Sequence, residues 1–162
     1  MQSQPKSKKR SDDTPAARAL RLLARREHTR RELEQKLKPH VEDPAELARV
    51  LDDFTARGWL SEARAAEQLV RAKRGRFGAA RIRQALTDKG VPHELIAGQL
   101  EALKSSELDT ARAVWARKFK TAPADQAERA RHVRFLQARG FSVEIAMRVV
   151  RGAGADDAGE DS

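Results

Sequence analysis

The side chains best suited to binding another molecule are six arginines and lysines that fall within one short stretch of the chain. They are Arg71, Lys73, Arg74, Arg76, Arg81 and Arg83. A guanidinium group can hold a phosphate or a carboxylate through two parallel hydrogen bonds, so these residues suit a nucleic-acid backbone and an acidic protein surface equally well. We therefore predict that this basic patch binds a polyanion.

Groupings of residues that would support catalysis or metal binding are missing from the sequence. The four histidines, His28, His40, His93 and His132, never pair at the spacing of two zinc ligands on one helical turn. There is no cysteine, and the run GRFG at 75–78 lacks the length and the Lys-Ser/Thr ending of a phosphate-binding loop. We expect no enzyme activity, no cofactor and no metal. His132 occupies the same place in its segment as Ile82 does in the preceding one, so we expect it in the core.

Amphipathic helices must position the basic patch, because apolar residues recur at spacings of three, four and seven along most of the chain. The clearest stripe is Leu47, Val50, Leu51 and Phe54. Hydrophobic residues make up 40% of the chain and aromatic residues only 4%, and no long run alternates as a strand would. The sequence predicts an all-α fold.

The predicted helices group into three triplets, 15–60, 61–104 and 105–152. Their starts carry recognisable caps: Thr14-Pro15, the capping box Thr29–Glu32, Asp43-Pro44 and Ser61. Glycine turns repeat as ARGW at 56–59, DKGV at 88–91 and ARGF at 138–141, and the last helix is predicted to end near Val150. Each triplet is too small to bury much apolar surface alone, so neighbouring triplets must stack.

Charge is distributed unevenly along the chain. Residues 1–14 form a basic arm and 153–162 an acidic tail, and we expect both to be disordered. The body, 15–152, has 29 basic and 18 acidic residues, and the surplus is concentrated in the second and third triplets. Such a surplus on folded helices favours a polyanion or an acidic protein surface as the partner, and the alternative is a surface that is only solvated.

Membrane segments and secretion signals are not apparent. No apolar run reaches the roughly 20 residues that a membrane-spanning helix needs, and the basic N-terminus is not followed by an apolar segment. We therefore expect a cytoplasmic protein that does not bind membranes. Trp59 and Trp115 are interpreted as anchors of the core or of contacts between repeats, rather than as platforms on which bases stack.

Three runs of sequence resemble one family. RGRFGAARIRQAL, preceded by GWLSEAR, resembles the middle of the RecX family, bacterial regulators of the RecA recombinase. ALRLLARREHTRRELEQKL is similar to the family's first repeat and VRFLQARGF to its third, so that the resemblance extends from about Ala16 to Arg151. The sequence departs from the family pattern at Ala65, where an aromatic residue is common, and at His132, which replaces an aliphatic one.

The resemblance implies a fold and a mode of action. In that family, three tandem three-helix repeats form an elongated curved array that lies in the groove of the RecA–single-stranded DNA filament. It hinders filament extension, ATP hydrolysis, strand exchange and SOS co-protease activity without chemistry of its own. On this basis we expect a monomer whose basic patch contacts RecA or single-stranded DNA.

The alternative is a helix-turn-helix-like regulator that binds duplex DNA without RecA. The candidate recognition helices have few side chains able to read base edges, and Gln84 on the central helix is the exception. This composition favours contact with phosphates over readout of sequence.

Overall fold

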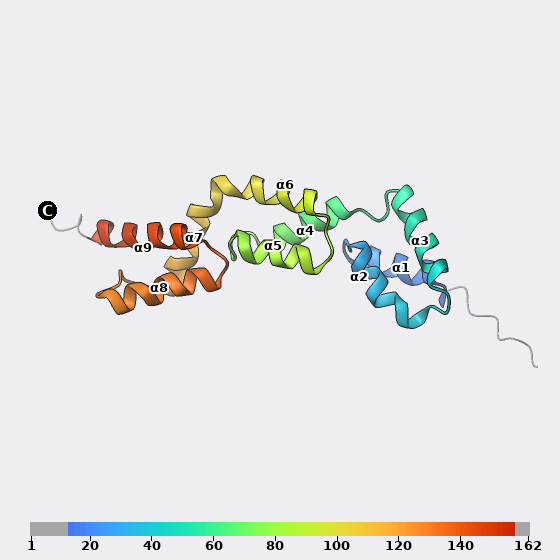
Figure 1. Cartoon of the computed structure of the whole chain (residues 1–162), viewed down its shortest axis with the longest axis horizontal. Helices are drawn as coiled ribbons and strands as arrows, with labels where there is room; N and C mark the ends of the chain where they lie inside the picture. Colours follow the sequence, from blue (N-terminus) through green and yellow to red (C-terminus); the bar gives the residue numbers. More distant parts are fainter. Residues whose placement is uncertain (1–12, 158–162) are drawn as a thin grey trace, which may run out of the picture. The chain divides into compact units, whose positions relative to one another are not determined.

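The computed structural model describes residues 13–157, and these are helical apart from short turns (Figure 1). The helices are α1 (Pro15–Arg25), α2 (Arg30–Leu37), α3 (Pro44–Ala56), α4 (Glu62–Lys73), α5 (Ala79–Asp88), α6 (His93–Leu103), α7 (Glu107–Lys118), α8 (Gln126–Ala138) and α9 (Val143–Asp157), with 3-10 turns η2 (Lys38–His40) and η3 (Lys104–Ser106). No strand occurs between residues 13 and 157, which confirms the all-α prediction. Nearly all of the predicted N-terminal arm lies outside the described residues.

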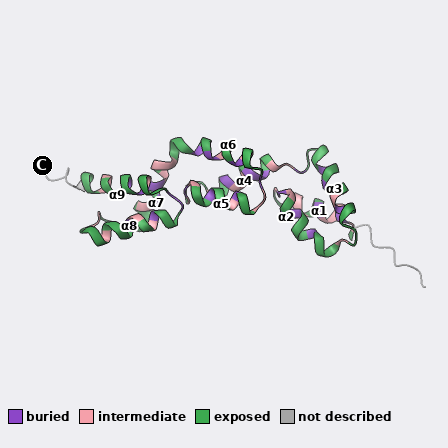
Figure 2. Ribbon diagram, in the orientation of Figure 1, coloured by how far each residue is buried: buried purple, intermediate pink, exposed green. Residues whose placement is uncertain are grey.

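The chain divides into two compact units, residues 1–65 and 66–162. The first contains α1, α2, α3 and the first residues of α4, and the second contains the rest of α4 and all later helices. Buried residues run along one side of each helix and face its neighbours within the unit (Figure 2). This is the arrangement that the amphipathic spacing predicts.

In the first unit the helices begin where the sequence predicts. The Thr14 hydroxyl accepts from Ala17 N at 3.2 Å, and the Asp43 carboxylate accepts from Ala45 N at 2.9 Å. Thr29 and Glu32 form the predicted capping box, with reciprocal bonds of 3.2 and 3.3 Å. The helices bury one apolar cluster: Ala19, Leu33, Leu37, Leu47, Leu51, Phe54 and Leu60.

Trp59 is not buried in a core, which was one of the two places that the sequence suggested for it. Its side chain is 45% exposed and lies on the turn after α3. One edge of the ring packs against Phe54, and the Arg57 guanidinium lies 5.0 Å from its centroid. The next residue, Leu60, is buried and belongs to the apolar cluster instead.

The three glycine turns share one geometry, as their repeated sequence predicts. Gly58, Gly90 and Gly140 all have positive φ, at 75°, 76° and 96°. In each turn the residue after the glycine donates its amide to the carbonyl five residues back, which is Phe54, Leu86 or Leu136. This is the bond that closes a Schellman motif, and it needs a residue that tolerates the left-handed conformation.

The second unit holds two apolar clusters, one for each of its triplets. The cluster of α4, α5 and α6 is Ala66, Val70, Ile82, Leu86, Val91, Ile96, Leu100 and Leu103. That of α7, α8 and α9 is Ala111, Val114, Leu136, Phe141, Ala146, Val149 and Val150.

The prediction that residues 153–162 are disordered is wrong for 153–157, because α9 continues to Asp157. Gly152 and Gly154 are absent from the glycines with positive φ, so neither ends the helix. Ala153 and Ala155 alternate with these glycines, and alanine, the strongest helix former, favours continuation of α9. Residues 158–162 lie outside the described part of the chain.

Candidate polyanion-binding site

Phe77, on the turn between α4 and α5, gathers three residues of the predicted patch. Lys73 Nζ lies 5.2 Å from the centroid of its ring, and the guanidinium carbons of Arg76 and Arg81 lie at 5.5 and 4.9 Å. The ring itself is half-buried and packs against the apolar cluster of α4–α6. Attraction between a cation and an aromatic face contributes about 0.5–1 kcal/mol at an exposed site, which is enough to orient these side chains.

The other three residues of the predicted patch are not part of this group. Arg71, Arg74 and Arg83 are exposed, and none of them is among the cations that lie over the Phe77 ring. Arg81 and Arg83 flank the buried Ile82, and residues two apart on a helix point to different sides. Arg81 also has a structural role, because its Nη1 donates to Ala138 O at 2.8 Å.

A contact between two turns joins the second and third triplets within this unit. Gly78 N donates to Arg139 O at 2.9 Å, and Ala80 N donates to Gly140 O at 3.1 Å. The carboxylate of Glu107 accepts from Ala79 N at 3.3 Å. The first amides of α5 therefore bond to acceptors at the start of α7 and just after α8. The positive N-terminal end of the α5 dipole meets the negative C-terminal end of the α8 dipole, and the two attract one another.

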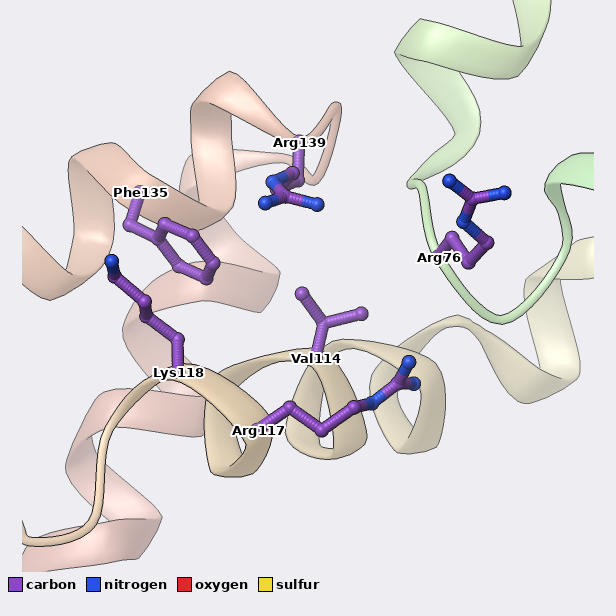
Figure 3. Close-up of a pocket in the computed structure, with 6 residues that line it drawn as sticks. All are labelled: Arg76, Val114, Arg117, Lys118, Phe135 and Arg139. Carbon is purple, nitrogen blue, oxygen red and sulfur yellow. The ribbon is translucent and has the colours of Figure 1, made fainter.

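This contact brings Arg76 beside basic residues of the third triplet. Together they line a hollow of about 210 Å³ (Figure 3): Arg76, Val114, Arg117, Lys118, Phe135 and Arg139. Arg117 Nη2 donates to Gly75 O at 2.8 Å and so fixes one wall. No acidic residue lines the hollow, and none of its four cations has a carboxylate partner among residues 13–157.

A second hollow continues the first along α7 and α8. It has a volume of about 560 Å³ and is lined by Lys118, Phe119, Arg131, Arg134 and Phe135. The two hollows share Lys118 and Phe135, so they form one surface. We call it the basic face and define it by its cations: Arg76, Arg117, Lys118, Arg131, Arg134 and Arg139.

Aromatic packing beneath the basic face holds α7 against α8. The Phe119 ring stacks on His132 at 3.6 Å and meets Phe135 edge-on at 5.3 Å. Trp115 Nε1 donates to His132 Nδ1 at 3.2 Å, which requires an imidazole that is neutral at that nitrogen. Burial lowers the pKa of His132, and the nearby Arg131 lowers it further.

These contacts confirm the interpretation of two residues. His132 is buried, with only 3% of its surface exposed, as expected from its equivalence to Ile82. Trp115 packs against the apolar cluster of α7–α9, so it is an anchor of that core.

Five of the six cations of the basic face belong to the third triplet and were not singled out from the sequence. They are Arg117, Lys118, Arg131, Arg134 and Arg139. The available signal was the charge count, because 105–152 carries ten basic and five acidic residues, the largest surplus of the three triplets. Their sequence positions are scattered, and only folding places them on one surface.

Residues 13–157 contain no group of three histidine, cysteine, aspartate or glutamate side chains that could hold a metal ion. Over the same range, no helix has both the length and the apolar character needed to cross a membrane.

Comparison with known families accounts for most of the described chain. Models of the first, second and third three-helix domains of RecX match residues 17–54, 61–98 and 105–150. The chain belongs to the RecX family. The resemblance stated from three runs of sequence is thereby confirmed.

Whole-chain relatives and solved structures agree with this assignment. The chain is 52% identical to the regulatory protein RecX of Leptothrix cholodnii over 83% of this chain and 85% of that one. It is 44% identical to that of Ralstonia nicotianae over 89% and 92%. The crystal structure of RecX from Lactobacillus salivarius superimposes with a TM-score of 0.77 over 89% of this chain and 98% of that one, at 18% identity, which shows a shared fold.

Proposed function

We propose that this RecX-family protein is a non-enzymatic negative regulator of RecA that acts in the cytoplasm as a monomer. It binds in the groove of the RecA–single-stranded DNA filament and hinders filament extension, ATP hydrolysis, strand exchange and SOS co-protease activity. Membership of the family supports the choice of partner. The basic face supports the mode of action, since it offers six cations and no lining carboxylate.

The physical basis of binding is electrostatic. Arg76, Lys118 and Arg139 lie around a hollow that no carboxylate lines, so their charge is available to phosphates or to acidic residues of RecA. Binding to single-stranded DNA releases counterions, and the slope of log K against log salt is about −0.7 for each phosphate neutralised. Several weak contacts along a repeating filament add up, which lets one molecule act on several subunits.

The experiment that tests this proposal is RecA ATP hydrolysis on single-stranded DNA, with the protein titrated below one copy per RecA. Inhibition at these ratios is expected, because a protein that merely competes for DNA must coat the strand to act. If hydrolysis falls only once the DNA is saturated, or if duplex DNA is bound equally well without RecA, the protein is a nucleic-acid-binding regulator instead.

Two matched triple variants test whether the basic face carries the binding. The first replaces Arg117, Lys118 and Arg134 with alanine, and the second replaces Arg71, Arg74 and Arg83, the exposed remainder of the predicted patch. Both remove three positive charges. The first variant is expected to lose inhibition and the second to keep most of it, with helical content unchanged in both. Equal loss in the two variants would mean that net charge alone, and not the basic face, is responsible.

A further inference from the structure

A groove between α8 and α9 lies apart from the basic face. Its lining consists of Gln126, Arg129, Ala130, Val133, Met147, Val150 and Arg151, and its volume is about 240 Å³. The floor is apolar and the two arginines belong to different helices. Met147 is 38% exposed, and Val143, one turn earlier on α9, is 51% exposed.

The groove and the basic face use different sides of α8. The α8 residues in the groove are Gln126, Arg129, Ala130 and Val133, which repeat at spacings of three, four and seven and so share one side of the helix. Arg131, Arg134 and Phe135 form a second set with the same kind of spacing, displaced around the axis. A ligand in the groove therefore does not occupy the basic face.

Within residues 13–157, neither arginine of the groove forms an ion pair with a carboxylate. The Asp125 carboxylate accepts from Glu128 N at 2.8 Å, and that of Glu128 accepts from Ala124 N at 2.8 Å, so both serve the start of α8. Arg129 and Arg151 have no ion pair within residues 13–157, and no acid lines the groove. An apolar floor between two arginines that have no ion pair within residues 13–157 favours a ligand that is apolar at its centre and acidic at its ends.

We propose that this groove binds a short acidic peptide segment of a partner protein, with one large apolar side chain seated between α8 and α9. That side chain covers Met147 and Val133, while flanking carboxylates pair with Arg129 and Arg151. Exposed apolar side chains in a hollow rimmed by polar residues are typical of protein interaction sites. A nucleic-acid backbone lacks the apolar centre that the floor requires. The inference does not depend on the proposed action on RecA.

The test is fluorescence anisotropy with short dye-labelled peptides in which one leucine, methionine or phenylalanine is flanked on each side by two glutamates. At least one of the three is expected to bind the whole protein. Replacing its central residue with serine, or its glutamates with glutamines, is expected to weaken binding about tenfold or more, the change that corresponds to 1.4 kcal/mol. If none of the three peptides binds, the proposal is wrong.

Protein variants distinguish the groove from the basic face, which also attracts acidic peptides. Arg129→Ala combined with Arg151→Ala, and separately Met147→Ser, are expected to weaken binding about tenfold. Arg148→Ala, which removes one positive charge from an exposed position on α9 outside the groove, serves as a control and is expected to have no effect.

The variant that lacks Arg117, Lys118 and Arg134 is likewise expected to bind the peptide normally while losing inhibition of RecA. Peptide binding that depends on those three residues, and not on the groove, would overturn the proposal. So would dimerisation of the protein through Met147, measured by sedimentation.

Discussion

Replacing Gly78 with alanine is expected to open the contact between the second and third triplets. A Cβ at this position would lie 2.5 Å from the carbonyl carbon of Gly140 and 2.6 Å from the amide nitrogen of Phe141. Both are backbone atoms, so no side-chain rotation can relieve the overlap. The two turns must therefore move apart.

The expected loss follows from the bonds that join the two turns. Separation breaks the bonds from Gly78 N to Arg139 O and from Ala80 N to Gly140 O, together with that from Arg81 Nη1 to Ala138 O. A hydrogen bond contributes a net of about 1 kcal/mol, so these three together contribute about 3 kcal/mol. We expect the free energy of unfolding of the second unit to fall by about 3 kcal/mol, a net value that already includes the replacement of the lost partners by water.

Urea unfolding followed by tryptophan fluorescence measures this change. The chain has two tryptophans, so a Trp59→Phe background leaves Trp115 as the only reporter, and it lies in the second unit. Gly98→Ala is the matched control, because a Cβ there has no neighbour within 4 Å and alanine in a helix is favoured by about 0.5–1 kcal/mol.

The Gly78 variant should also bind single-stranded DNA more weakly, since Arg76 would no longer be held beside Arg139. A Gly78→Ala protein as stable as the parent, with intact DNA binding, would refute the reasoning.

Three further predictions concern pH and helix ends. Burial lowers the pKa of His132 in the folded state, so below about pH 6.5 the unfolded state binds a proton more readily than the folded state does. The free energy of unfolding of the second unit is therefore highest above about pH 6.5 and falls as the pH drops below it. His132→Ile should flatten that dependence in urea titrations between pH 5 and 7.5, and an unchanged slope would contradict it. Thr29→Ala should destabilise the first unit by about 1 kcal/mol through loss of its capping box, with Thr29→Ser restoring most of the loss, as circular dichroism in urea would show. Gly152→Ala should increase helicity by circular dichroism, because α9 passes through this residue and its Cβ would meet open space; unchanged helicity would indicate that the helix ends earlier.

Features set by local sequence were predictable, while those made by contact between triplets were not. Helix starts such as Thr29 and turns such as Gly140 have characteristic residue types at fixed offsets, since neighbouring side chains and backbone groups determine them. The place of Arg76 on the basic face depends on the approach of Gly78 to Gly140, and no spacing within the sequence reveals which glycine will meet another. For the same reason the bond from Arg81 to Ala138 O was not predictable, while the place of Arg81 in the basic patch stays a prediction.

Prediction also failed where a residue type has two uses. Gly152 and Gly154 resemble the glycines that end helices elsewhere in the chain, yet they lie within α9. Glycine only permits the left-handed conformation, and does not impose it. Whether a helix stops depends on the packing that follows, which the sequence window around these residues does not contain.

The bonds between the two turns have a consequence for hydrogen exchange. Gly78 and Ala80 precede or begin α5, where amides ordinarily exchange quickly with solvent because no intrahelical acceptor is available. Here they are bonded to the carbonyl oxygens of Arg139 and Gly140, on the turn between α8 and α9, so their deuterium uptake should be slow. The rate of uptake should report the free energy needed to separate the two triplets. A ligand that spans Arg76 and Arg139 would slow it further. Deuterium uptake at these two amides would therefore measure how firmly the second unit holds Arg76 beside Arg139.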